Sequence, residues 1–129
     1  MTIKALLLLS LLATTLSANE WNLVWSDEFD GKGHPDPEKW GYESAFVRNK
    51  EQQYYTTKRL KNARLENGHL VIEGHKESPS ADSLKNEPTK KLPKINYTSA
   101  SLHTKGLASW KFGKIEVRAK VPNGPGVWP

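Results

Sequence analysis

The side chains able to carry out acid–base or metal chemistry in this sequence of 129 residues are 14 aspartates and glutamates and four histidines, without any cysteine. The absence of cysteine excludes a disulfide framework, a cysteine nucleophile and a cysteine-based zinc site. The densest acidic run, DEFD at residues 27–30, belongs to a turn-like segment. The histidines have neither helical nor paired metal-ligand spacing, so we interpret them as surface or strand residues. They are His34, His69, His75 and His103.

The first 18 residues have the layout of a secretory signal peptide. Lys4 precedes an apolar run at residues 5–13, and small residues precede Asn19. The alternative is an anchor helix, but a bilayer span needs about 20 apolar residues. We therefore expect cleavage after Ala18, which gives a secreted or periplasmic protein of residues 19–129 without a membrane anchor.

The formal net charge of +5 gives a weak indication of partners. The densest basic cluster is Lys90, Lys91 and Lys94, in a stretch rich in proline, serine and asparagine. It could bind an anionic polymer, but a solvated loop is the simpler interpretation. A nucleic-acid-binding domain would need a concentrated basic stripe interleaved with aromatic residues, which this sequence lacks.

The remaining pattern predicts short antiparallel strands. Residues 62–66 and 69–73 flank Asn67-Gly68, the strongest short hairpin signal in a sequence. Residues 113–121 alternate clearly, with apolar side chains at every second position from Ile115. Segments 53–57 and 97–105 are rich in strand formers, and the polar stretch 74–96 is predicted to be a loop. No segment has a sustained helical period, so we expect an all-β antiparallel β-sandwich.

Four segments, in this order, resemble the N-terminal part of a glycoside hydrolase family 16 domain of the laminarinase (endo-β-1,3-glucanase) type. They are WSDEFDG at 25–31 with Trp40, NKEQQYYT at 49–56, NARLENGHLVIE at 62–73 followed by YTSA at 97–100, and TKG at 104–106 followed by FGKIEVRAKVP at 112–122 and GVWP at 126–129. The resemblance implies a concanavalin A-like jelly roll, incomplete in this chain. It also implies a retaining endo-β-glucanase acting on β-1,3 or mixed-linkage β-glucan, with the polysaccharide as partner and a monomer once the domain is complete.

Retaining catalysis needs two carboxyl groups about 5–5.5 Å apart. The family supplies them from a Glu-x-Asp-x-x-Glu strand, soon after the Gly-x-Trp-Pro segment. The nearest text here, from Glu28 to Gly33, has no second glutamate. We therefore expect both catalytic glutamates beyond Pro129, no catalytic residue among these 129, and no hydrolysis by this polypeptide alone.

The resemblance also implies substrate contacts. Asn49 occupies the position of an amide that binds a glucose hydroxyl, although a loop-capping role is an equal alternative. Lys50 stands where the family often has a second asparagine. Ser101 stands where the family has an arginine over the cleft, so that contact is missing or replaced.

Three further residues are candidates for the cleft. Trp128 and Trp110 could stack on a sugar ring, and for Trp110 we favour packing over a cleft role. Arg118, with Glu116, lies on the polar face of the alternating segment and lines the cleft or faces water. No cofactor is required for the implied reaction. A structural calcium ion would bind near Glu28 and Gly68.

A second function is left open by the sequence: a non-catalytic β-glucan-binding jelly roll that has lost its glutamates. The residues that follow in the coding sequence would decide between the two. We also expect the isolated chain to be poorly folded or aggregation-prone, because a partial sandwich leaves its inner sheet faces uncovered.

Overall fold

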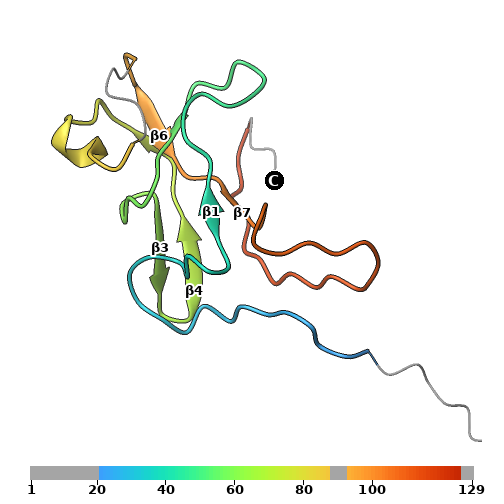
Figure 1. Cartoon of the computed structure of the whole chain (residues 1–129). Helices are drawn as coiled ribbons and strands as arrows, with labels where there is room; N and C mark the ends of the chain where they lie inside the picture. The colour runs from blue at the N-terminus through green and yellow to red at the C-terminus, as the bar shows by residue number, and fades with distance from the viewer. Residues whose placement is uncertain (1–20, 88–92, 126–129) are drawn as a thin grey trace, which may run out of the picture.

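The computed structural model describes residues 21–87 and 93–125, and these form an all-β arrangement (Figure 1). The signal-peptide prediction, Lys90, Lys91 and Trp128 lie outside the described residues. The described chain contains seven short strands and one 3₁₀ turn. They are β1 (Gly41–Tyr42), β2 (Tyr54–Tyr55), β3 (Ala63–Glu66), β4 (His69–Ile72), β5 (His75–Lys76), η1 (Asp82–Leu84), β6 (Tyr97–Ser99) and β7 (Leu102–His103).

The strands form three small sheets: β1–β7, β2–β6–β5 and β3–β4. The β1–β7, β3–β4 and β5–β6 pairs are antiparallel, as the sequence predicts. The β2–β6 pair is parallel, and residues 56–96 connect its two strands. The all-β prediction is confirmed, with this one parallel pair added.

The predicted hairpin is present as β3 and β4. Asn67 and Gly68 have φ angles of 52° and 73°, which a two-residue turn of this kind requires. The register pairs Glu66 with His69 and Ala63 with Ile72. The left-handed turn at Asn67-Gly68 therefore sets the β3–β4 register, and the predicted hairpin is confirmed.

The stretch 74–96 is more structured than the predicted loop. It contains β5, which pairs with β6, and η1, which brings Leu84 into the core. The buried apolar cluster consists of Tyr54, Leu84 and Ile95, with Ala45 packed against it. The prolines and polar residues of this stretch indicated a loop. Leu84 and Ile95 are nevertheless buried, and their packing orders the residues around them.

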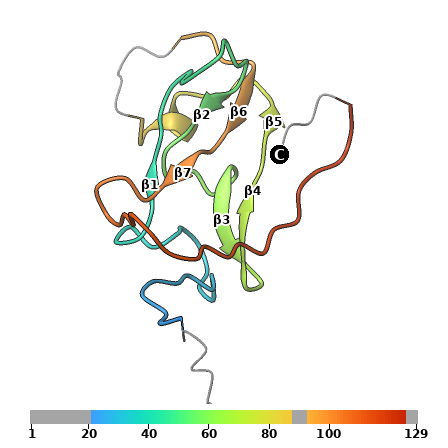
Figure 2. The same ribbon diagram turned by 90° about the vertical axis from the view of Figure 1, so that its right-hand side faces the viewer.

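The prediction of a strand at 113–121 is wrong for this structure. The segment has no strand assignment, and the side chains of Ile115 and Val117 are 77% and 80% exposed. Residues 104–125 run as an extended arm that stands to one side of β3 and β4 in Figure 1 and passes in front of them in Figure 2. A strand exists only through hydrogen bonds to a neighbouring strand, and none of the described residues pairs with this segment.

Within the described residues, no helix combines the length and the apolar character that crossing a membrane would require.

Candidate functional site

The predicted sugar contact Asn49 lies at the tip of an exposed turn. The backbone N–H of Glu51 donates to the carbonyl of Arg48 at 3.0 Å, which closes the turn. Asn49 and Lys50 both have positive φ angles, 53° and 55°. Asparagine tolerates this left-handed conformation better than most residues, so the loop-capping alternative explains the residue type as well as sugar binding does.

Glu43 connects this turn to Ser101, the other cleft position that the resemblance singles out. The Ser101 hydroxyl donates to Glu43 Oε2 at 2.6 Å, and Arg48 Nη2 donates to the same oxygen. The Glu43 backbone N–H also donates to the Ser101 carbonyl at 2.9 Å, which extends the β1–β7 pairing by one position. The hydrogen bonds from Ser101 and Arg48 lower the pKa of Glu43, so this carboxyl is ionised at neutral pH.

The β1–β7 pair places four residues on one face. Gly41 faces His103, and Glu43 faces Ser101, because side chains alternate along each strand. The His103 ring lies over Gly41, where a Cβ atom would come within 2.5 Å of His103 Cε1. His103 Nδ1 is buried and has no hydrogen-bond partner among the described residues. This face therefore carries a carboxylate, a hydroxyl and an imidazole close together.

Tyr55 contacts the residues at both ends of this turn, Arg48 and Glu51. The Arg48 guanidinium lies 5.6 Å from the centre of the Tyr55 ring, within the range of a cation–π contact. The Tyr55 hydroxyl donates to Glu51 at 2.9 Å and accepts from Gln53 at 3.0 Å. Both ends of the turn that carries Asn49 are thus attached to one largely buried aromatic ring.

The other predicted substrate contacts lie in other parts of the described chain or outside it. The ring of Trp110 packs edge-on against Trp25, with 5.4 Å between ring centres, and the residue remains 42% exposed. Arg118 is exposed on the extended arm, where no salt bridge or hydrogen bond of its side chain is recorded within the described residues. Trp128 lies outside the described residues.

The predicted calcium site receives no support from side-chain geometry. Glu28 and Gly68 are both exposed. Across residues 21–87 and 93–125, no three histidine or acidic side chains gather as a metal-binding group. Calcium prefers six to eight oxygen ligands, and this part of the chain does not assemble them from carboxylates. The calcium site near Glu28 and Gly68, for which the resemblance implies backbone carbonyl ligands, therefore stays a prediction.

The carboxylates with shifted pKa values are not suited to act as a general acid. A glycosidase acid needs a raised pKa. Arg64 lowers the pKa of Glu73, and Arg59 is the main cause that lowers the pKa of Glu77 to about 2. Together with Glu43, every shifted carboxylate of the described residues is thus held in its ionised form.

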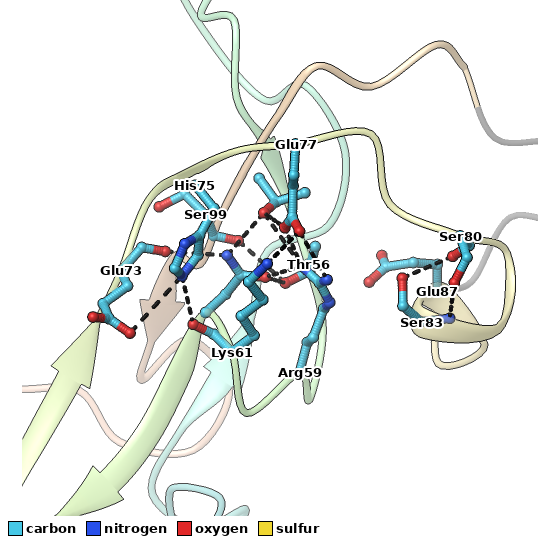
Figure 3. Close-up of polar contacts among 12 residues, drawn as sticks. Thr56, Arg59, Lys61, Glu73, His75, Glu77, Ser80, Ser83, Glu87 and Ser99 are labelled. Atoms are coloured by element: carbon cyan, nitrogen blue, oxygen red, sulfur yellow. Dashed lines mark hydrogen bonds and ion pairs between the residues drawn. The ribbon is translucent and has the colours of Figure 1, made fainter.

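A partly buried polar cluster that the sequence did not predict joins the loop at residues 59–62 to β6 and to Glu77 (Figure 3). Glu77 accepts from Arg59 at 2.6 Å, from Lys61 at 2.6 Å and from the Thr98 hydroxyl. Asn62, fully buried, accepts from Arg59 at 2.8 Å and donates to Thr98 at 3.0 Å. Because all of these contacts except Arg59–Asn62 join residues 16 to 36 positions apart, no local pattern could have indicated the cluster.

Two open hollows on the surface lie away from the predicted contacts. One, of about 340 Å³, is lined mainly by Pro79, Leu84, Pro93 and Ile95. The other, of about 530 Å³, lies along β5 and the start of β6. Neither includes Asn49 or Arg118, and both of these residues are exposed.

Comparison with known proteins links this arrangement to β-glucan enzymes. A beta-glucanase from Rhodothermus marinus is 46% identical over 114 residues, which cover 87% of this chain and 35% of that protein. The X-ray structure of the laminarinase from Rhodothermus marinus superposes with a TM-score of 0.59 at 45% identity, over 73% of this chain and 33% of that one. No protein-family model matches the chain.

A shorter match points to a binding protein. A beta-1,3-glucan-binding protein from Tenebrio molitor is 53% identical over 38 residues, which cover 30% of this chain and 8% of that protein. The chain spans about a third of the length of the beta-glucanase and laminarinase described above. The likeness to solved laminarinases confirms the predicted fold class.

Proposed function

Because this chain is related over most of its length to laminarinase-type glycoside hydrolases of family 16, we propose that it is part of a retaining endo-β-glucanase. The observation that carries the proposal is the 46% identity over 114 residues to a beta-glucanase. The substrate is β-1,3-glucan or mixed-linkage β-1,3-1,4-glucan. The protein is secreted, which the signal-like pattern of residues 1–18 supports.

The proposed division of labour assigns substrate positioning, not bond cleavage, to these residues. The sequence contains no Glu-x-Asp-x-x-Glu strand, and the described carboxylates with shifted pKa values are all stabilised as anions. The chain spans a third of the length of its relative. We assign the nucleophile and the general acid to the part of such a domain that it does not span.

A hydrolysis assay tests this proposal directly. Residues 19–129 are purified and incubated with laminarin and with mixed-linkage β-glucan, and released reducing ends are measured against a mock preparation. We expect no turnover from this polypeptide. A version extended through the next strands of the coding sequence should release oligosaccharides with retained anomeric configuration. Turnover by residues 19–129 alone would contradict the assignment.

A non-catalytic glucan-binding protein is the second candidate. The match to a beta-1,3-glucan-binding protein favours it over the region that is shared. The two candidates differ in the coding sequence that follows. An intact Glu-x-Asp-x-x-Glu motif indicates the enzyme, whereas substituted glutamates indicate the binder.

A calcium ion remains a proposal that the described side chains do not support. Isothermal titration of the extended protein with calcium chloride would test it, because a bound ion gives a saturable heat that chelator abolishes.

A further inference from the structure

The carboxylate of Glu43 links the β1–β7 face to the turn that carries Asn49. Arg48, in the turn, and Ser101, directly before β7, both donate to one oxygen of Glu43. The family pattern has an arginine at position 101, and this chain has a serine there. In this chain the guanidinium that pairs with Glu43 comes instead from Arg48.

We propose that Arg48 and Glu43 form a hydroxyl-recognition pair for a neutral β-glucan chain, in which Arg48 supplies the guanidinium that position 101 lacks. This inference rests on the proposed function and deepens it. It assigns a specificity-determining role to two residues that sequence analysis did not select.

The two side chains are fixed before any ligand binds. Arg48 is held by Glu43 on one side and by the Tyr55 ring on the other. Glu43 is held by Ser101 through the hydrogen bond to its side chain and through backbone pairing. A side chain that is already immobilised loses little conformational entropy on binding, so it contributes more of its hydrogen-bond energy to affinity.

Each member of the pair retains groups that face solvent. The side chains of Arg48 and Glu43 are 43% and 27% exposed. Within the described residues, Ser101 and Arg48 both bond to Oε2 of Glu43, which leaves Oε1 as an acceptor. Arg48 donates through Nη2, and a guanidinium has five N–H donors in all.

A donor beside an acceptor matches the hydroxyl groups of a sugar. Each sugar hydroxyl both donates and accepts, so adjacent hydroxyls on one ring can bond to a guanidinium and a carboxylate at once. The Glu43 charge offsets that of Arg48, which makes the pair a poor site for a sulfated or carboxylated glycan. The chemistry therefore selects a neutral polysaccharide, in agreement with β-glucan.

Affinity electrophoresis tests the pair on the purified chain of residues 19–129. Migration is compared in gels with and without laminarin, and keratan sulfate serves as the anionic probe. We expect Arg48→Ala to weaken laminarin binding about tenfold, the loss of one or two charge-assisted hydrogen bonds. Arg48→Lys should weaken it less, because an ammonium retains the charge but not the planar array of donors. Lys32→Ala is the matched control, which removes an exposed positive charge elsewhere and should leave binding unchanged.

Glu43→Gln separates hydroxyl recognition from anion recognition. It should weaken laminarin binding, because the stronger charged acceptor is lost. If the site binds anions instead, the wild-type chain would bind keratan sulfate and Arg48→Ala would lose that binding, and that result would overturn the inference. Near-ultraviolet circular dichroism of each variant verifies that its aromatic packing is unchanged.

The outcomes separate this inference from the proposed function. Wild-type binding to laminarin with an unchanged Arg48→Ala variant overturns the inference and leaves the glucanase proposal standing. Absence of wild-type binding to both laminarin and mixed-linkage glucan contradicts glucan positioning by these residues, and the hydroxyl-recognition pair is rejected with it.

Discussion

Residues 63–72 and residues 113–121 both carry clear strand patterns, and in this structure only the first segment forms strands. In the hairpin, β3 and β4 pair along four positions, and Ala63 is fully buried. In the extended arm, Ile115 and Val117 are exposed, and no described strand pairs with them. The hairpin carries its partner a few residues away, whereas the arm needs a partner from elsewhere.

This difference in pairing explains which part of the chain has a buried apolar core, called the body below. The described core comprises six buried apolar residues, and all of them lie between positions 54 and 100. Large exposed apolar side chains gather at residues 21–24 and 107–121 instead. An alternating pattern therefore indicates which face is to be buried, but burial itself depends on a second layer.

The first prediction sets a core residue against a residue of the arm. Leu84→Ala should destabilise the body by about 3 kcal/mol, because Leu84 is 5% exposed and packs in the central cluster. Val117→Ala should change stability by less than about 0.5 kcal/mol, because Val117 is 80% exposed. Urea unfolding followed by tyrosine and tryptophan fluorescence measures both. Equal losses would show that the arm is packed in solution.

Much of this contrast could be anticipated from sequence, but not all of it. The Asn67-Gly68 turn fixes the β3–β4 register locally, so the hairpin was predictable. The parallel β2–β6 pair and the burial of Leu84 join distant segments, and no short pattern encodes them. Asn49 was selected from resemblance, while Arg48 and Glu43 became candidates only when the structure placed them beside Ser101.

A second prediction concerns the polar centre of the body. Glu77→Gln should lower the free energy of unfolding by about 3 kcal/mol. The reason is that the Arg59 side chain, only 12% exposed, would lose its carboxylate partner. Glu66→Gln is the matched control. Glu66 is 47% exposed in its pair with Arg64, and such surface pairs contribute less than about 1 kcal/mol. Urea unfolding at neutral pH compares the two variants, and a larger loss for Glu66→Gln would contradict the central role of Glu77.

The same carboxyl predicts how stability depends on pH. The hydrogen bond from Arg59 is the main cause that lowers the pKa of Glu77 from 4.5 to about 2. A depressed pKa stabilises the fold above the unfolded-state value, and this stabilisation is lost as the pH falls from about 4.5 toward 2. It amounts to roughly 3 kcal/mol at most. Urea midpoints measured from pH 6 to pH 2 should fall less steeply in Glu77→Gln than in the wild type.

The smallest expected effect tests the turn of the hairpin. Gly68→Ala should lower the free energy of unfolding by about 1 kcal/mol, because a φ angle of 73° is unfavourable for a residue with a Cβ atom. The cost comes from the backbone alone, since no atom lies within 4 Å of the added Cβ. Gly74→Ala is the control. Its new Cβ would lie 3.9 Å from the Thr98 carbonyl, an ordinary contact, and its φ is not in the left-handed region. Similar unfolding midpoints for both variants would indicate that the turn is not under this constraint.

Amide hydrogen exchange resolved by residue tests most directly whether pairing, rather than pattern, decides which segments are ordered. In dilute solution of residues 19–129, the strand pairs of the structure predict slow exchange for paired amides of β2, β3, β4 and β6, against the poor folding expected from the sequence, and fast exchange throughout 113–121. Protection at alternate amides of 113–121 would contradict the account, because it would mean that the arm forms a strand without the partner we consider necessary. Uniformly fast exchange would contradict the existence of an ordered body.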